Sequence, residues 1–189
     1  TGTLFDLLNP YGLLGGLTTL MLFFTHGVQF IALKTEGDLR TRARSLAVRS
    51  GLITIVVAAS FLVWTVLQHL DIAHLPVLIA LAAAAAVALI GSWVANRIGL
   101  EKWAFGLMAV TITFAVASIL AALFPNVMPS TTDPAYSLTI ANASSSQYTL
   151  EVMTWVAVVM MPLVLAYQAW TYWVFRRRIT RESIPVAAH

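Results

Sequence analysis

Five apolar stretches, each about as long as a membrane-crossing helix, leave this chain few folds other than a membrane bundle. They cover roughly residues 10–33, 50–70, 76–95, 103–124 and 148–175. A helix needs about 20 mostly apolar residues to cross the hydrocarbon core of a bilayer. Only 10% of the residues are charged, whereas a soluble domain carries about 25%. The sequence therefore predicts an all-α, polytopic transmembrane helical bundle with five spans.

The basic residues orient these spans. All eleven Lys and Arg lie in polar stretches that follow the first, third and fifth apolar segments. These residues are Lys34, Arg40, Arg42, Arg44 and Arg49, then Arg97 and Lys102, then Arg176, Arg177, Arg178 and Arg181. Because cytoplasmic loops are enriched in Lys and Arg, we expect the N-terminus outside and the C-terminus inside. The cations form no long basic face, so the net charge of +3 does not indicate nucleic-acid binding.

The segment ends carry local signals. Asn9 and Pro10 predict the start of the first helix, and Ser144-Ser-Ser-Gln147 has the pattern of a capping box before the last. We expect residues 34–49 to form an inner loop with a short amphipathic extension of the helices. Residues 125–147 form a long outer loop whose prolines prevent a continuous helix.

Polar residues follow one face of the first apolar segment. Thr18, Thr25, His26 and Gln29 recur at three- and four-residue spacing, so this face should meet protein or a water-filled cavity. His26 either carries protons or binds a quinone oxygen, or it is a neutral imidazole bonded to a neighbouring helix. Gly12 and Gly16 form a G-x-x-x-G pair that permits close approach of another helix.

Other ionisable residues give weaker indications. Glu151, near the start of the last span, either transfers protons or is stabilised there by the helix dipole. His69 and His74 flank Asp71. These histidines either bind a metal ion or are interfacial residues without a metal. The chain has no Cys, no glycine-rich phosphate loop and no paired carboxylates. We assign it no catalytic, cofactor-binding or metal-binding residue, and keep His26, Gln29 and Glu151 as candidate intramembrane polar or proton-route residues.

Several motifs, in order, resemble subunit II of the bacterial cytochrome bd-type quinol oxidases, in its C-terminal half. The chain begins its first span with Asn9-Pro-Tyr-Gly-Leu-Leu-Gly-Gly16, which Lys34-Thr-Glu-Gly-Asp-Leu-Arg40 follows. Later come Phe124-Pro-Asn-Val-Met-Pro-Ser-Thr131 and Ala143-Ser-Ser-Ser-Gln-Tyr-Thr-Leu150, leading into Val152-Met-Thr-Trp-Val-Ala157. The proline-rich outer loop with the following Met-Thr-Trp is the most specific part.

This resemblance implies a subunit of a quinol:oxygen oxidoreductase in the bacterial plasma membrane. Such a complex oxidises quinol and reduces dioxygen to water. The family's subunit I holds two b-type haems and one d-type haem, so this chain would bind none and would have no catalytic centre. It would instead support assembly, the haem environment and proton or oxygen access. The implied partners are the haem-bearing subunit I, quinone and lipids. The resemblance is also compatible with small accessory subunits.

The family's subunit II also has a preceding half of about four spans, which this sequence does not contain. The chain therefore resembles the interior or a fragment of a longer polypeptide, and it shows no signal-peptide pattern. One alternative from another class remains open: a fragment of a secondary membrane transporter, in which polar stripes and proline-kinked spans are common.

Overall fold

The computed structural model describes residues 9–70, 73–130 and 133–177, and it contains five helices long and apolar enough to cross a membrane. They are α2 (Pro10–Lys34), α3 (Gly37–Gln68), α4 (Leu75–Ile98), α5 (Glu101–Leu123) and α7 (Gln147–Val174). The predicted all-α fold with five spans is confirmed. Arg178 and Arg181, which the sequence placed in the closing basic stretch, lie outside the described residues.

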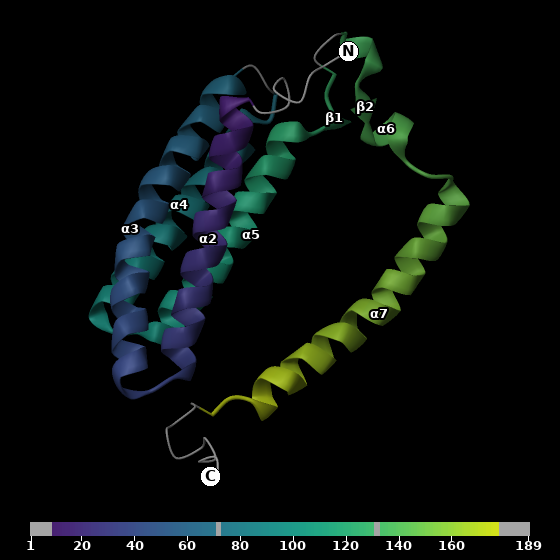
Figure 1. Cartoon of the computed structure of the whole chain (residues 1–189). Helices are drawn as coiled ribbons and strands as arrows, with labels where there is room; N and C mark the ends of the chain where they lie inside the picture. Colours follow the sequence, from purple (N-terminus) through teal and green to yellow (C-terminus); the bar gives the residue numbers. More distant parts are fainter. Residues whose placement is uncertain (1–8, 71–72, 131–132, 178–189) are drawn as a thin grey trace, which may run out of the picture. The chain divides into compact units, whose positions relative to one another are not determined.

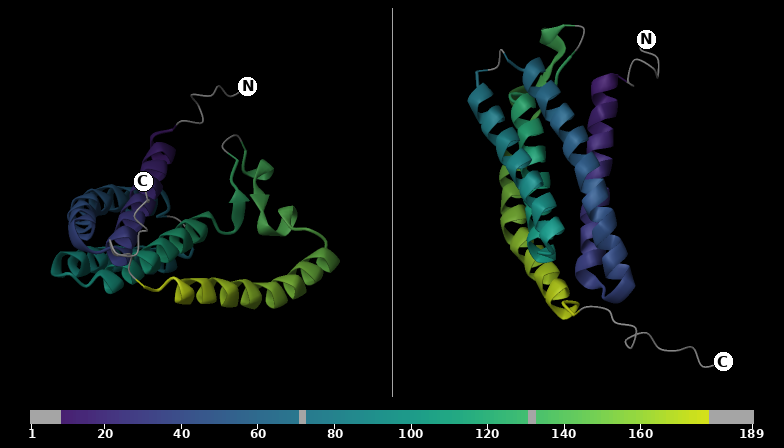
Figure 2. Two further views of the ribbon diagram at one scale, coloured as in Figure 1. Left: turned by 60° about the horizontal axis from the view of Figure 1, so that its bottom comes forward. Right: turned by 90° about the vertical axis from the view of Figure 1, so that its left-hand side faces the viewer.

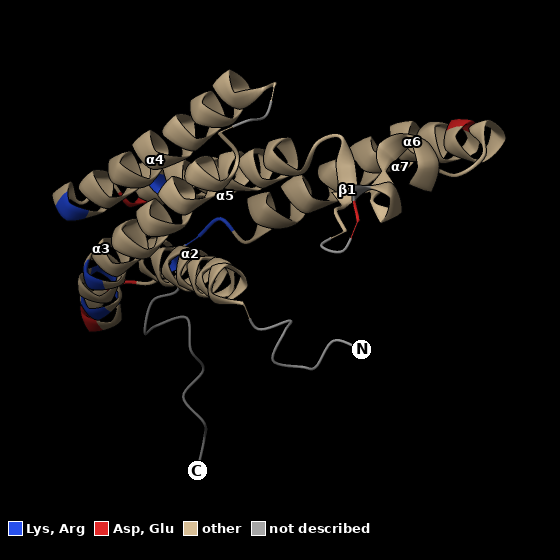
Figure 3. Cartoon of the chain, turned by 90° about the horizontal axis from the view of Figure 1, so that it is seen from above, with Lys and Arg blue, Asp and Glu red and all other residues tan. Residues whose placement is uncertain are grey.

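The chain divides into two compact units, and each is described by itself. The described part of the first unit contains α2 to α5, and the second covers residues 123–177. In the first unit the four helices lie side by side and run alternately up and down (Figures 1 and 2). Consequently the end of α2, the start of α3, the end of α4 and the start of α5 share one end of this unit. We call this the charged end, because Figure 3 shows the basic positions of α3 and α4 gathered there.

The start of α2 agrees with the sequence prediction. Asn9 caps the helix by accepting a hydrogen bond from the Gly12 amide at 2.6 Å, and Pro10 occupies the first helical turn. Proline suits that position because its missing N–H would have no partner within the helix.

The start of α3 differs from the prediction. The helix begins at Gly37 rather than near Ser50, so most of the expected inner loop is helical. Arg, Leu and Ala are strong helix formers, and they dominate the stretch from Leu39 to Ala47. A helix of 32 residues is about 48 Å long, well beyond the roughly 30 Å hydrocarbon core. The first turns of α3 therefore extend past the end of the span and carry its basic residues.

Close helix packing occurs at other glycines than the predicted pair. A Cβ on Gly16 would meet no atom within 4 Å, whereas one on Gly15 would lie 3.1 Å from the Phe61 ring. On α3, a Cβ on Gly51 would lie 3.0 Å from Cδ1 of Trp93 on α4. The expectation that Gly12 and Gly16 mediate close approach receives no support within this unit.

The second unit begins with a small folded segment. The strands β1 (Asn126–Met128) and β2 (Leu138–Thr139) pair antiparallel around a short 3-10 helix, η1 (Pro134–Tyr136). The short helix α6 (Ile140–Ala143) follows, with a capping box formed by Thr139 and Asn142. The predicted outer loop is thus not a continuous helix, as its prolines required.

The start of α7 corrects a second prediction. Its N-cap is Ser146, whose hydroxyl accepts from the Thr149 amide at 3.4 Å, so Ser144 is not the cap and Gln147 is not its partner. Gln147 instead donates to the Glu151 carboxylate one turn on, at 3.2 Å. The helix continues through Pro162 and is bowed along its length in Figure 2. No described residue of α7 is buried.

Candidate functional site

Gln29 anchors a set of polar contacts inside the first unit. Its side chain is buried, and its Nε2 donates to the Ser92 hydroxyl on α4 at 3.0 Å. The Ser92 hydroxyl in turn donates to the backbone carbonyl of Ala104 on α5 at 2.7 Å. A hydroxyl has a single proton, so Ser92 must accept from Gln29, which fixes the orientation of the amide. These two hydrogen bonds join α2, α4 and α5.

Three buried side-chain atoms nearby lack a hydrogen-bond partner among the described residues. They are Nδ1 of His26, Oε1 of Gln29 and Nδ2 of Asn96. Asn96 follows Ser92 by four residues on α4, and both side chains are fully buried. The Gln29 oxygen requires a donor and the Asn96 nitrogen requires an acceptor, so their needs are complementary. We call His26, Gln29, Ser92 and Asn96 the polar seam.

His26 packs against an aromatic ring of the neighbouring α5. Its imidazole stacks on Phe105, with ring centroids 4.2 Å apart and an interplanar angle of 16°. The residue is half-buried, one helical turn from Gln29 on the same face of α2. Ring stacking, rather than a hydrogen bond at Nδ1, therefore holds the side chain in place.

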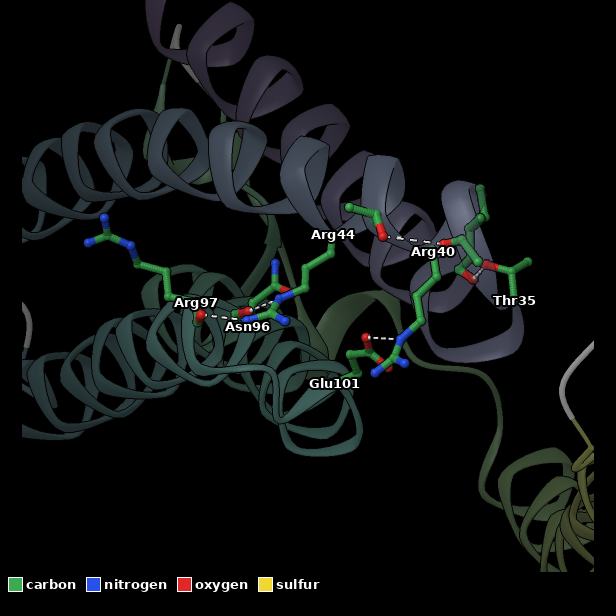
Figure 4. A network of polar contacts seen from close by, with 9 residues as sticks. Thr35, Arg40, Arg44, Asn96, Arg97 and Glu101 are labelled. Atoms are coloured by element: carbon green, nitrogen blue, oxygen red, sulfur yellow. Dashed lines mark hydrogen bonds and ion pairs between the residues drawn. The ribbon is translucent and has the colours of Figure 1, made fainter.

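The charged end contains a buried carboxylate that the sequence analysis missed. Glu101, in the first turn of α5, is 4% exposed and accepts from Nε of Arg40 on α3 at 2.7 Å. Its position at a helix N-terminus also favours negative charge. The ion pair connects the extended start of α3 to α5 (Figure 4).

Arg44 caps the end of α4 from the same extension of α3. Its guanidinium donates to the carbonyl of Asn96 at 3.1 Å and to that of Arg97 at 2.6 Å. The last carbonyls of a helix lack intrahelical partners, so this contact satisfies groups that α4 cannot satisfy itself. Gly99 ends the helix with a φ of 87°, and a Cβ there would lie 3.0 Å from Nη1 of Arg44.

Hydroxyl groups join α2 to α3 farther along the unit. The buried hydroxyls of Thr25 and Thr54 lie 2.9 Å apart, and the Tyr11 hydroxyl lies 2.9 Å from that of Thr65. The polar face predicted for the first span is therefore turned inward at Thr18, Thr25 and Gln29, all of which are buried.

Glu151 lies in the second unit, unlike His26 and Gln29. Its carboxylate is exposed, accepts from Gln147, and lines an open pocket with Thr154 and Trp155. The structure thus brings two of the three predicted candidates together and leaves the third in a separate unit.

The two histidines that flank Asp71 contact backbone carbonyls. Nδ1 of His69 lies 2.7 Å from the Thr65 carbonyl oxygen, and Nε2 of His74 lies 2.5 Å from that of Ala121. Among residues 9–70, 73–130 and 133–177 there is no group of three or more potential His, Cys, Asp or Glu ligands. Asp71, between the two histidines, lies outside the described residues.

Sequence reasoning overlooked Ser92, Asn96 and Glu101. A sequence signal existed for the first two, because polar residues four apart on an otherwise apolar helix share one face. Glu101 stood among charged residues at the start of a span, where a solvent-exposed position was the natural expectation.

Comparison with known proteins assigns the family. The sequence model described as "Cytochrome bd terminal oxidase subunit II" matches residues 1–175. The cytochrome bd-I ubiquinol oxidase subunit 2 of Escherichia coli K12 is 34% identical over 219 aligned residues, which cover all of this chain and 58% of the relative. The cytochrome bd ubiquinol oxidase subunit 2 of Bacillus subtilis 168 is 36% identical over 179 residues, covering 94% of this chain and 53% of the relative.

A third relative, the probable cytochrome oxidase subunit 2 of Haemophilus influenzae Rd, is 30% identical over 204 residues, covering 91% of this chain and 53% of the relative. The chain thus spans a little over half the length of these relatives. The family match extends over α2 to α7, so it includes both the polar seam and the second unit. This chain therefore belongs to the cytochrome bd terminal oxidase subunit II family.

Proposed function

We propose that this chain is an integral membrane subunit of a bd-type oxidase that oxidises quinol and reduces dioxygen to water. The observation that carries the proposal is the family match over residues 1–175. The E. coli and B. subtilis relatives are named as subunits of ubiquinol oxidases. In this proposal the chain corresponds to the C-terminal half of subunit II and lies in the bacterial inner membrane, with the charged end in the cytoplasm.

The exposed apolar surface supports a role within a larger assembly. Large apolar side chains such as Trp155, Leu163 and Trp170 on α7 are more than half exposed, and the helix buries no residue within the described structure. Transmembrane helices associate through close packing with other helices. We infer that a haem-bearing subunit I and a preceding half of subunit II pack against these faces, with haems b and d held by subunit I.

Co-purification tests this assignment. An affinity tag on this chain should isolate a membrane complex whose reduced-minus-oxidised spectrum shows b- and d-type haem bands and which oxidises quinol in the presence of dioxygen. A tagged complex without these bands contradicts the proposal. Respiration-independent, substrate-dependent uptake into vesicles would instead favour a transporter.

The polar seam gives this subunit a proposed role in handling protons. Buried polar atoms in proteins are nearly always hydrogen-bonded to protein or to ordered water. Oε1 of Gln29 and Nδ2 of Asn96 are sealed inside the first unit, where a partner subunit has no access. A water placed between them would donate to the first and accept from the second.

Such water would connect the charged end with His26 at membrane depth. Asn96 is also linked to the charged end, because its backbone carbonyl accepts a hydrogen bond from the guanidinium of Arg44. An imidazole has two ring nitrogens, so it can accept a proton at one and release a proton from the other along a chain of hydrogen bonds. The seam is therefore proposed as a short hydrated branch of a proton route.

Two substitutions test this role. In the purified complex, His26→Phe keeps the stacking on Phe105 but removes the titratable group, and Gln29→Leu removes the oxygen that would hold water. Both should slow quinol oxidase turnover, and with it the rate of proton uptake, by up to about 100-fold, the lower end of what one positioned proton-transfer group contributes, with the haem content unchanged. Gln68→Leu, at an exposed position on α3, is the matched control. An unchanged rate of proton uptake in both variants would mean that the polar seam only packs the helices together.

A further inference from the structure

An open pocket lies on the exposed surface of α3 and α4. The inference drawn from it does not depend on the oxidase assignment. It is lined by residues of α3 and by one residue of α4, near the charged end. These are Thr41, Arg44, Ser45, Val48, Arg49 and Arg97. The three ionisable residues among them are arginines, and no carboxylate of the described residues lines the pocket.

The arginines are held in place by neighbouring groups. The guanidinium of Arg97 lies over the Trp93 ring, 4.6 Å from its centroid, and the Trp93 indole donates to the Val48 carbonyl at 3.1 Å. Arg44 is fixed by its hydrogen bonds to the end of α4. Figure 4 shows the Arg97 side chain extending away from the Arg44 guanidinium, so the positive charges are spread along the pocket.

Among the described residues, no carboxylate is paired with Arg44, Arg49 or Arg97, and the ion pair of Arg40 with Glu101 lies outside the pocket. Two exposed arginines, Arg49 and Arg97, thus line one site together with the hydroxyl group of Ser45. Planar guanidinium groups with a nearby hydroxyl suit the oxygens of a phosphate group.

An apolar track leads from the pocket toward the middle of the spans. Leu52 and Val56 follow Arg49 on α3 at helical spacing and are 52% and 61% exposed. On α4, Val94 and Ile90 precede Arg97 in the same way and are 43% and 50% exposed. A ligand with a phosphate at one end and hydrocarbon at the other fits this arrangement better than a free anion does.

We propose that the pocket binds the phosphate headgroup of an anionic phospholipid, with an acyl chain lying along the exposed track between α3 and α4. Basic pockets between transmembrane helices near the membrane surface are suited to anionic headgroups. The Arg97–Trp93 stack places one cation at the depth where headgroups lie, because tryptophan favours the membrane interface. The extension of α3 provides the remaining arginines.

Lipid titration of the intact purified complex tests the proposal. After removal of bound lipid, short-chain phosphatidylglycerol should bind more tightly than phosphatidylcholine of the same chain length, as measured by native mass spectrometry. Replacing both Arg49 and Arg97 by Gln should weaken phosphatidylglycerol binding roughly 25-fold, since each arginine near the membrane surface contributes about a fivefold effect. Arg44 is kept, because it also caps α4.

A matched variant controls for net charge. Arg42→Gln combined with Lys102→Gln removes two exposed cations from the same end of the unit without changing the pocket lining. It should leave the affinity for phosphatidylglycerol within about twofold of the wild type, because its charges lie outside the site. A comparable loss of phosphatidylglycerol affinity in both double variants would mean that general surface charge, and not a specific site, attracts the lipid. That result would overturn the proposal.

Competition with inorganic phosphate distinguishes a site for a lipid headgroup from a site for a free anion. At equal concentration it should not displace phosphatidylglycerol, because it lacks the acyl chain that contacts the track. Displacement by phosphate would mean a site for a free anion. Absence of any phosphatidylglycerol binding to the wild-type complex would equally overturn the proposal, including the case in which another subunit covers this face.

Discussion

Individual polar residues hold the first unit together at depths where lipid offers no hydrogen bonds. The amide of Gln29 reaches two other helices through Ser92, and the hydroxyls of Thr25 and Thr54 meet between α2 and α3. A polar group left without a partner in an apolar environment is costly, so each contact also disfavours other registers of the same helices. The Arg40–Glu101 pair plays a similar part at the charged end.

Arg40→Ala removes the ion-pair partner of a carboxylate whose side chain is only 3% exposed. We expect a loss of about 2 kcal/mol in the stability of the complex, since the charge on Glu101 remains in a desolvated position. The thermal midpoint of the purified complex in detergent measures this loss. Arg42→Ala, at an exposed position two residues away, serves as the control and should change little.

A double substitution separates the ion pair from other effects of Arg40. If the desolvated carboxylate is the cause, adding Glu101→Gln to Arg40→Ala should recover part of the lost stability. Additive losses in the double variant would show that the two side chains act independently.

At the scale of helices, small residues determine how closely α2 and α3 approach. Ala32 on α2 and Ala43 and Ala47 on α3 are buried together with Val28. Alanine at such positions lets two backbones come close, which favours packing within a membrane. The same segment of α3 presents its arginines on other faces, so one helix serves both packing and surface recognition.

Ala47→Leu should disturb this contact because Ala47 is only 1% exposed. The larger side chain has no space between α2 and α3, and overpacking of this kind costs about 1–3 kcal/mol. Ala59→Leu, at an exposed position on the same helix, should cost less than about 0.5 kcal/mol. Thermal unfolding of both variants provides the comparison, and equal midpoints would mean that α2 and α3 do not pack through Ala47.

At the scale of the whole molecule, the distribution of cations predicts orientation in the membrane. The charged end of the first unit holds seven of the eleven Lys and Arg residues and only three carboxylates, those of Glu36, Asp38 and Glu101. Loops with this excess of positive charge are retained in the cytoplasm. The segment between α5 and α7 contains no Lys or Arg, and we expect it on the opposite side.

Single-cysteine labelling tests this orientation, and the absence of native cysteine makes it direct in this chain. In intact cells a membrane-impermeant maleimide should modify Ser145→Cys but should modify Glu36→Cys only after permeabilisation. Mass spectrometry of peptides from this chain reads out each position. The reverse pattern would require an inverted topology, and with it a different explanation for the basic residues.

The fold of this chain follows from its sequence more completely than the site does. The five spans and the inward polar face of α2 follow from periodicity and length, which are local properties of the chain. The expectation for Gly12 and Gly16 stays a prediction, since neither glycine meets another helix within the first unit. The wrong predictions, at the start of α3 and the cap of α7, concern choices between several adjacent residues of similar propensity. Such choices depend on contacts with other helices, as for Gly15 against Phe61.

The sequence by itself determined that the chain is a bundle of membrane-spanning helices and that His26 and Gln29 share a face, because apolar length and helical spacing need no information from distant residues. Tertiary structure alone decided which distant residues meet them. It brought Ser92 to Gln29 and Ala104 to Ser92, Glu101 to Arg40, and Arg97 into one pocket with Arg49. The reason is physical: a buried polar group is satisfied by whichever helix packs beside it, and that neighbour is chosen by the packing of the whole unit.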